Sequence, residues 1–339
     1  MKFMKTHSVG FTAKEKAEYL VRELETVPSG RNMLVKTHFD LISAGTELAN
    51  YHGLPNTCAD DGYPIFTGYS ASGIVEAVGP EVKKFKPGDR VLCNKLAHHA
   101  RFLAGEEHFY PIPDDVSMET AAAAFLCTFP LLGVRKLQLQ MGESVMVAGL
   151  GLLGQFSAQI ARINGAAPVL VCDFSPERRE LALQLGADHA LDPREKDFIE
   201  KVKELTDGRG PEGVVEVTGY ISALQQALEY VAWQGRISLL GCTRVSDQTI
   251  DFYRYVHRRG VQLIGCHTAT RPQRDSFPGQ WTEEDDYRTF FKYVRTGRLQ
   301  VDPVIPHRAD PRDAENLFKK IGSEKIPPLG ILFDWRDID

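Results

Sequence analysis

Three glycines at fixed spacing form the strongest chemical signal in the sequence. Gly149, Gly151 and Gly154 follow the apolar run SVMVA and precede the helical pattern QFSAQIARI. In a strand–loop–helix unit, the first glycine permits a tight turn, the second lets the backbone approach a pyrophosphate, and the third allows close packing of helix on strand. Leu152 and Leu153, which open the helix, offer backbone N–H groups to the anion. The loop therefore predicts a dinucleotide-binding site.

An acidic residue, Asp173, ends the next apolar run, PVLVC, about 20 residues after the glycines. A carboxylate at this position accepts hydrogen bonds from ribose hydroxyls and repels a 2′-phosphate, so Asp173 favours NAD(H) over NADP(H). We expect Arg178, one helical turn further, to stack on the adenine. Its neighbour Arg179 leaves binding of NADP(H) open, because a guanidinium also binds phosphate.

The glycine loop and Asp173 need a parallel sheet to bring them together. From Ser144 onward, apolar runs alternate with amphipathic stretches, which predicts βαβ units and a doubly wound parallel sheet of the Rossmann type. Ser175 before Pro176, and Ser222 before ALQQAL, are predicted helix N-caps. The first 120 residues instead contain short predicted strands between turns: MLVKTHFDLIS, SASGIVEAVG, DRVLCN and HARFLAG. We therefore predict an α/β protein of two domains, with a first boundary near residues 130 to 140.

Length and composition agree with two domains and exclude some classes of ligand. The chain has 339 residues, 43% hydrophobic and 25% charged, with a formal net charge of −5. Such a charge gives no field for phosphate backbones or anionic lipid, so we expect a small-molecule substrate rather than nucleic acid or a membrane. We expect a cytoplasmic protein, because the N-terminus lacks the apolar core of a signal peptide and no C-x-x-C pair occurs. The cysteines are Cys58, Cys93, Cys127, Cys172, Cys242 and Cys266.

Several longer passages resemble the medium-chain dehydrogenase/reductase superfamily of alcohol, sorbitol and threonine dehydrogenases and quinone reductases. They are SGIVEAVGPEVKKFKPGDRV, VMVAGLGLLGQFSAQIARINGA, LALQLGADHALDP, VVEVTG, GRISLLG and PVIPHRADPRDAENLF. The resemblance implies a GroES-like, β-rich catalytic domain of residues 1–135 and 285–339, and a Rossmann domain of residues 136–284. It further implies an active site in the cleft between the domains, and a homodimer or homotetramer.

The residues that bind catalytic zinc in this superfamily are not matched. Zinc-dependent members carry a Cys two residues before a Ser or Thr, then a Gly-His-Glu segment, then a third ligand, Cys or Glu. Here Ala44 stands in place of the Cys, Tyr69 and Ser70 in place of His-Glu, and the third position falls near Phe125, with Cys127 close by. One possible ligand of three cannot hold a tetrahedral ion, and the four-Cys loop of a structural zinc is also missing. The resemblance therefore predicts a protein without zinc.

The same resemblance points to five candidate catalytic residues. Thr46 matches the hydroxyl that contacts the substrate oxygen, and Tyr69 either donates a proton or fills the vacated metal cavity. Glu47 corresponds to an acid beside the metal, and acts as a base or is ion-paired. His52 completes a proton relay to solvent or is a surface residue, and the His267 side chain, after the last strand, faces the substrate.

Further contacts with the cofactor and the substrate are predicted at the carboxyl ends of the last strands and in the loop that follows them. The nicotinamide carboxamide is expected to contact backbone near Gly241, Cys242, His267 and Ala269. Three side chains between residues 268 and 286 could bind a carboxylate, a phosphate or a sugar: Arg271, Arg274 and Trp281. An oligomer contact or a solvated loop is the alternative for this segment.

Together these features predict a zinc-independent, NAD(H)-linked oxidoreductase that moves hydride between nicotinamide and a polar carbonyl or secondary alcohol, such as a sugar, polyol or sugar acid. The first alternative is an enone or quinone-type reductase, because conjugated substrates need only hydrogen-bond polarisation. The second is a nucleotide-binding protein without catalytic activity. The glycine loop with Asp173 supports cofactor binding in all three cases.

Overall fold

The computed structural model describes residues 3–338 and divides the chain into two compact units. Unit 1 comprises the residues up to Leu126 and those from Val301 onward, and unit 2 comprises residues 127–300. The division is discontinuous, as the resemblance implies, but both boundaries differ from the expected 135/136 and 284/285. The second boundary lies later because helix α8 (Glu283–Arg295) is anchored within unit 2, where its buried Asp286 pairs with Arg135 at 2.7 Å.

Unit 1 contains a seven-stranded sheet whose order places the C-terminal tail beside the N-terminal strands. The order is β14-β15-β3-β4-β5-β7, and β6 pairs with β3. The strands are β3 (Asn32–Ile42), β4 (Ser70–Val78), β5 (Arg90–Asn94), β6 (Arg101–Gly105), β7 (Phe109–Pro111), β14 (His307–Ala309) and β15 (Ile331–Asp334). A separate hairpin joins β1 (Phe3–Ala13) and β2 (Lys16–Glu25). The helices are α1 (Ala44–Tyr51), α2 (Met118–Ala122) and α9 (Ala314–Ser323), and α3 (Ala124–Lys136) begins here and continues into unit 2.

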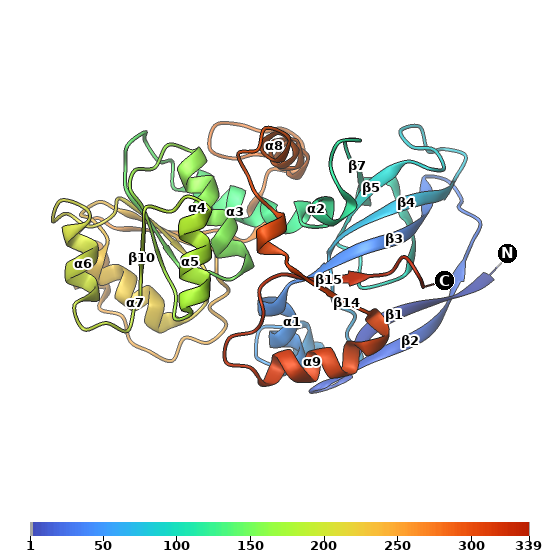
Figure 1. Ribbon diagram of the computed structural model, residues 1–339, viewed down its shortest axis with the longest axis horizontal. Helices are drawn as coiled ribbons and strands as arrows, with labels where there is room; N and C mark the ends of the chain where they lie inside the picture. The colour runs from blue at the N-terminus through green and yellow to red at the C-terminus, as the bar shows by residue number, and fades with distance from the viewer. Residues whose placement is uncertain (1–2, 339) are drawn as a thin grey trace. The chain divides into compact units, whose positions relative to one another are not determined.

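The core of unit 1 is aromatic and joins distant parts of the chain. Phe11 of β1, Tyr51 of α1, Phe318 of α9 and Trp335, just after β15, are all buried in one cluster. Figure 1 shows α1 and α9 side by side beneath these strands. The tail therefore completes the core of the first domain.

Unit 2 is a six-stranded parallel sheet in the order β10-β9-β8-β11-β12-β13. Its central strands are continuous buried apolar runs, as expected for a sheet covered on both faces. The strands are β8 (Val145–Ala148), β9 (Val169–Cys172), β10 (His189–Leu191), β11 (Gly213–Glu216), β12 (Arg236–Leu239) and β13 (Gln262–Gly265). Figure 1 shows the helices packed around them: α4 (Leu152–Ile163), α5 (Pro176–Gln184), α6 (Phe198–Glu204) and α7 (Ile221–Tyr230). The predicted doubly wound sheet is confirmed.

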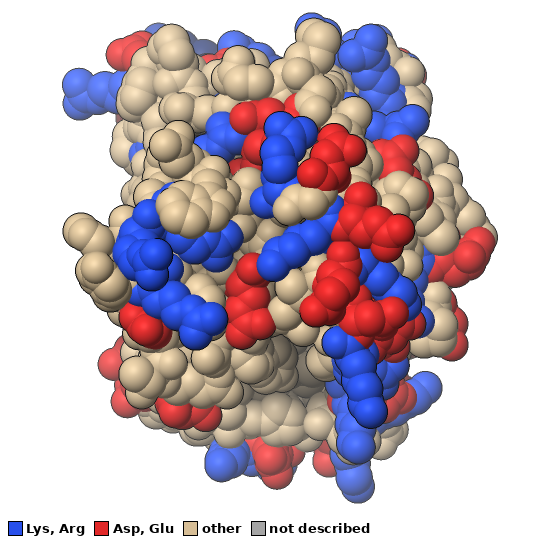
Figure 2. Space-filling view, turned by 90° about the vertical axis from the view of Figure 1, so that its left-hand side faces the viewer, with Lys and Arg blue, Asp and Glu red and all other residues tan. Residues whose placement is uncertain are grey.

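No helix among residues 3–338 combines the length and apolar character needed to cross a bilayer. All six cysteines are free thiols. On the face shown in Figure 2, Lys and Arg side chains are interspersed with Asp and Glu.

Candidate functional site

The glycine loop follows β8 and has the geometry of a nucleotide cradle. Gly149 has a φ of +95°, which favours glycine, and a Cβ on Gly154 would lie 1.9 Å from the Gly149 carbonyl oxygen. These two glycines are therefore required by the turn and by helix packing. Gly151 differs, because its φ is −65° and a Cβ there would meet nothing within 4 Å. Steric contacts within the described chain do not require glycine at position 151, and the open space there leaves room for a closely approaching ligand.

Helix α4 begins at this loop without a side-chain cap. Gly151 is its N-cap and offers no acceptor, so the first N–H groups of the helix remain available to an anion. Twelve residues of α4 align their peptide dipoles toward the same point, which favours negative charge there. These features fit the pyrophosphate of a nicotinamide dinucleotide, held by the N–H groups of Leu152 and Leu153.

Asp173 lies beside the glycine loop, as its position after β9 predicts. Its carboxylate accepts hydrogen bonds from the N–H groups of Leu150 at 2.7 Å and Ser175 at 2.8 Å. Arg178 Nη1 lies 4.0 Å from the same carboxylate. Arg179 instead bonds the Asp173 carbonyl at 2.6 Å and turns to Asp192 at 3.3 Å. The geometry keeps a carboxylate, and not the Arg179 guanidinium, at the position where the sequence predicts the ribose to bind.

The role of Asp173 can be tested by replacing it with alanine. We expect Asp173→Ala to improve the affinity for NADPH relative to NADH, because the repulsion of a 2′-phosphate is removed. Fluorescence titration of both cofactors measures the ratio of the two dissociation constants. Glu177→Ala, which removes a nearby exposed carboxylate on α5, is the matched control and should leave the ratio unchanged. An unchanged ratio in Asp173→Ala would show that this carboxylate does not select the cofactor.

The residues expected to contact the nicotinamide carboxamide follow β12 and β13. Gly241 and Cys242 come after β12, and His267 and Ala269 come after β13, at the same edge of the parallel sheet as the glycine loop. Ligands of open parallel sheets bind at this edge. The His267 ring is exposed, and its Nδ1 accepts a hydrogen bond from the Ala269 N–H at 3.1 Å. This hydrogen bond stabilises the turn. The catalytic role of His267 stays a prediction.

In unit 1, three positions implied by the resemblance to be metal-binding come together. Tyr69, which precedes β4, donates its hydroxyl proton to Ser43 Oγ at 2.5 Å, and Ser43 immediately precedes Ala44. The ring of Tyr69 also contacts the ring of Phe125 edge-on, with centroids 5.6 Å apart. A methyl group, a phenol and a phenyl ring therefore occupy these positions.

This donor set does not fit a catalytic zinc, which needs three N, S or O ligands. Across residues 3–338 no group of three His, Cys, Asp or Glu side chains could hold a metal ion. Asp40 and Glu47 both lie beside His98, but they contact opposite nitrogens of its ring. The three side chains therefore do not converge on one point. We therefore assign no step to a metal.

A buried charge network supports the segment that carries Thr46. His98 is fully buried, with Nδ1 2.9 Å from Asp40 and Nε2 2.8 Å from Glu47. Glu47 also accepts a hydrogen bond from the Ser43 N–H at 2.7 Å, and the indole N–H of Trp335 donates to Asp40 at 3.0 Å. The network thus ties Ser43, the acceptor of the Tyr69 hydroxyl, to β3 and to the C-terminal tail. Nothing in the sequence spacing of these residues indicated it.

The two carboxylates keep His98 protonated. Burial opposes the charge, but Asp40 and Glu47 outweigh it and raise the pKa of His98 to about 10 from an ordinary 6.5. Burial also raises the pKa of Asp40, an effect that His98 and Trp335 partly offset. His98 is therefore an imidazolium at neutral pH.

This shift predicts how stability depends on pH. The folded-state pKa of His98 lies above the unfolded-state value, so its contribution is complete below pH 6.5 and is lost as pH rises to about 10. We expect the free energy of unfolding of wild type to fall across this window, as measured by urea titration at several pH values. The variant His98→Leu should lack this component of the slope. Equal slopes in both proteins would show that His98 is not protonated.

Two of the predicted catalytic residues, Glu47 and His52, make contacts typical of structural roles. Glu47 is buried and ion-paired, so the alternative of a free base is corrected. His52 caps the far end of α1 from Ser43, roughly 13 Å away along the helix axis, and pairs with Glu15 at 3.0 Å. The pairing with Glu15 agrees with the alternative of a surface residue, and the proton relay to solvent through His52 stays a prediction. Thr46 is half-buried in the first turn of α1, and its substrate contact stays a prediction.

The expected substrate-binding segment is only partly available to a ligand. Arg271 is buried, with Nε 3.5 Å from Asp286 and Nη1 3.6 Å from Glu283. The Arg135 guanidinium lies 4.2 Å from the centroid of the Trp281 ring and covers a face of the indole. These contacts favour structural roles for Arg271 and Trp281, in place of the predicted substrate contacts. Arg274 is exposed, and its role stays a prediction.

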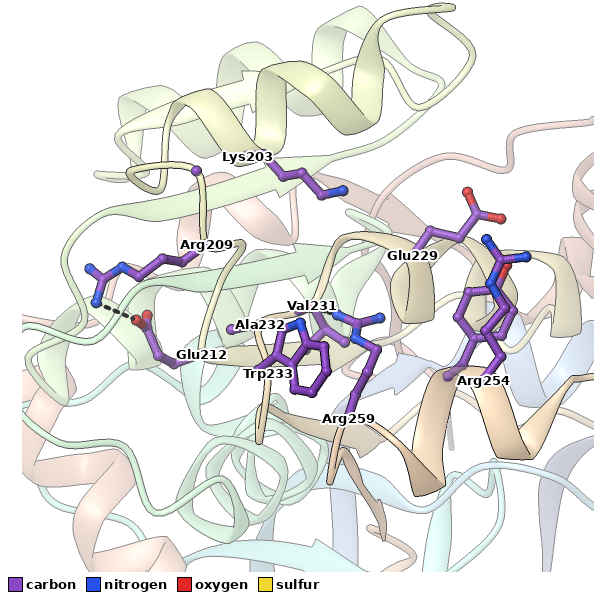
Figure 3. Close-up of a pocket in the computed structure, with 11 residues that line it drawn as sticks. Lys203, Arg209, Glu212, Glu229, Val231, Ala232, Trp233, Arg254 and Arg259 are labelled. Atoms are coloured by element: carbon purple, nitrogen blue, oxygen red, sulfur yellow. Dashed lines mark hydrogen bonds and ion pairs between the residues drawn. The ribbon is translucent and has the colours of Figure 1, made fainter.

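A pocket of about 640 Å³ opens in unit 2 at the amino ends of β11 to β13, opposite the edge that carries the glycine loop. Figure 3 shows basic side chains and Trp233 around it. Part of its charge is used internally, because Arg209 pairs with Glu212 at 3.9 Å and Arg259 donates to the carbonyls of Leu228 and Val231. The pocket is thus separate from the predicted dinucleotide site.

The fold and the glycine loop together define a two-domain, nucleotide-binding protein, and comparison with known proteins specifies the family. Residues 37–125 match the alcohol dehydrogenase GroES-like domain, and residues 153–283 match the zinc-binding dehydrogenase family. The chain belongs to the medium-chain dehydrogenase/reductase superfamily. This confirms the resemblance and the fold class.

Sequence identity to the individual relatives described here is 35% or lower. The chain is 35% identical over 167 residues to L-threonine 3-dehydrogenase of Pyrococcus horikoshii, which is 49% of this chain but only 44% of that relative. It therefore spans less than half the length of such relatives. D-guloside 3-dehydrogenase of Escherichia coli is 28% identical over 268 residues, 77% of this chain and 75% of the relative. A solved oxidoreductase of unknown specificity from Escherichia coli superposes with a TM-score of 0.84 at 20% identity over 98% of this chain and 99% of that one.

Proposed function

We propose that this protein is a zinc-independent, nicotinamide-dependent oxidoreductase that interconverts a polar carbonyl compound and a secondary alcohol. The observation that carries the proposal is Gly151, an open position at the start of α4, where the helix has no side-chain cap and a ligand can approach the backbone closely. The bound nicotinamide supplies or accepts the hydride. In this proposal the residues of unit 2 named above hold the cofactor.

Zinc independence rests on the side chains at positions 44, 69 and 125. The rings of Tyr69 and Phe125, which contact each other, stand at two of the expected ligand positions. The Tyr69 hydroxyl donates a hydrogen bond to Ser43. Without a Lewis acid, the substrate oxygen must be polarised by hydrogen bonds or by a positively charged side chain. Thr46, exposed in part on the first turn of α1, is the proposed hydrogen-bond donor.

The preferred cofactor in this proposal is NAD(H). Support comes from the Asp173 carboxylate beside the glycine loop and from Arg179, which is turned to Asp192. One solved neighbour, a zinc-binding dehydrogenase from Sinorhizobium meliloti, is bound to NADP, so NADP(H) remains the alternative to test.

For the substrate we propose a sugar, polyol or sugar acid. Support comes from relatives named sorbitol dehydrogenase in Bacillus subtilis and D-guloside 3-dehydrogenase in Escherichia coli. A panel of polyols, sugars and their acids with NAD⁺, and of hydroxy-aldehydes with NADH, tests the class through absorbance of the reduced cofactor. Turnover of hydroxy compounds is expected. Reduction of conjugated enones or quinones alone would overturn this substrate class in favour of an enone reductase.

A further inference from the structure

A lysine stands beside the aromatic pair that occupies the expected metal position. Lys95 directly follows β5, and its backbone N–H donates to the carbonyl of Tyr69 at 3.0 Å. Its Nζ lies 5.8 Å from the centroid of the Phe125 ring, within the range of a cation–π contact. The Tyr69 ring contacts the same Phe125 ring. The ammonium and the phenol therefore flank one ring.

The backbone at Lys95 is unusual for its residue type. Its φ is +55°, in the left-handed region that residues other than glycine seldom adopt. Such conformations are found disproportionately at functional sites, where the placement of a side chain offsets the strain. The side chain is exposed, so its ammonium can exchange protons with solvent.

Tyr69 is less suited to donate a proton outward. Its hydroxyl proton is already given to Ser43 Oγ at 2.5 Å, and the Glu47–His98 network holds Ser43 in place. To protonate a substrate, Tyr69 would have to break that bond. Lys95 differs from Tyr69 in carrying three N–H donors on a flexible stem.

We propose that Lys95 is the catalytic residue that stabilises and protonates the reacting oxygen, an inference that rests on the oxidoreductase function proposed above. When hydride adds to the carbonyl carbon, the electron pair of the C=O π bond moves to oxygen. That oxygen takes a proton from Lys95 Nζ, so one O–H bond forms and one N–H bond breaks. The resulting neutral amine regains its proton from solvent, and alcohol oxidation follows the reverse path. A positive charge aimed at the developing alkoxide supplies the electrostatic stabilisation that a metal would otherwise give.

The test compares Lys95→Gln, Lys95→Arg and wild type, with NADH and DL-glyceraldehyde as the probe carbonyl. Lys84→Gln, which removes an equally exposed lysine of unit 1, is the matched control. NADH affinity, measured by fluorescence titration, should be unchanged in all variants. We expect kcat of Lys95→Gln to fall by about 100-fold or more, the usual contribution of a general acid. Lys95→Arg should keep substrate affinity, because it keeps the charge, but lose most of kcat, because guanidinium does not release its proton.

The split between kcat and NADH affinity separates a catalytic from a structural role. In Lys95→Gln, kcat should fall while the NADH affinity stays that of wild type, whereas a structural role would lower both. Active wild type with Lys95→Gln within twofold of it would overturn the inference and leave the proposed function intact. Wild type that binds NADH but reduces neither glyceraldehyde nor any sugar or polyol partner would overturn both.

Discussion

Replacing Gly151 by valine is expected to abolish NADH binding while leaving the fold intact. A side chain at this position meets no protein atom within 4 Å, and the φ of −65° is accessible to valine, so the protein itself tolerates the change. The new side chain would instead occupy the space above the start of α4 where the pyrophosphate lies in our proposal. We expect the dissociation constant to rise by at least about 100-fold, or roughly 2.8 kcal/mol, by fluorescence titration.

Gly154→Ala provides the contrast to this variant. A Cβ there lies 1.9 Å from the Gly149 carbonyl oxygen, so helix and strand must separate and the thermal midpoint should drop. Gly151→Val should keep the midpoint of wild type. If Gly151→Val bound NADH as tightly as wild type, the loop would not be the pyrophosphate site.

The second large effect is on stability: His98→Leu should destabilise the protein by about 3–5 kcal/mol. The substitution leaves Asp40 and Glu47 buried without a counter-charge. Urea unfolding followed through Trp335, in a background where Trp233 and Trp281 are phenylalanine, reports on unit 1.

A triple variant tests whether the loss of stability comes from the unpaired buried charges. Adding Asp40→Asn and Glu47→Gln to His98→Leu removes the buried charges together, so part of the lost stability should return. A loss below about 1 kcal/mol in His98→Leu would indicate that the three groups do not carry their charges in the folded protein.

Unit 2 was largely predictable because its signals are local. Continuous apolar strands, glycines at fixed spacing and Asp173 after the next strand all lie within one short stretch of chain. The Ser175 cap is also confirmed, since its Oγ accepts the Arg178 N–H at 3.2 Å. The Ser222 cap is wrong: α7 already starts at Ile221, because Tyr220 is its N-cap residue.

Unit 1 was less predictable because its important contacts are long-range. The first predicted strand began at Met33, and the β1–β2 hairpin before it was missed, since charged residues interrupt its pattern of apolar residues. Helix α1, which begins at Ala44, was not predicted. His98 and Lys95 carried no motif. Their roles depend on partners such as Asp40 and Phe125, which lie tens of residues away in the sequence.

The central claim is that nicotinamide-dependent turnover proceeds here without zinc. The most direct measurement is the NADH-dependent reduction of hydroxy-aldehydes by chelator-washed protein whose zinc content is determined by elemental analysis of the same sample. We predict full turnover at a zinc content far below one ion per chain, with no increase on adding zinc. About one zinc per chain retained after washing, or activity that rises in proportion to added zinc, would contradict the account.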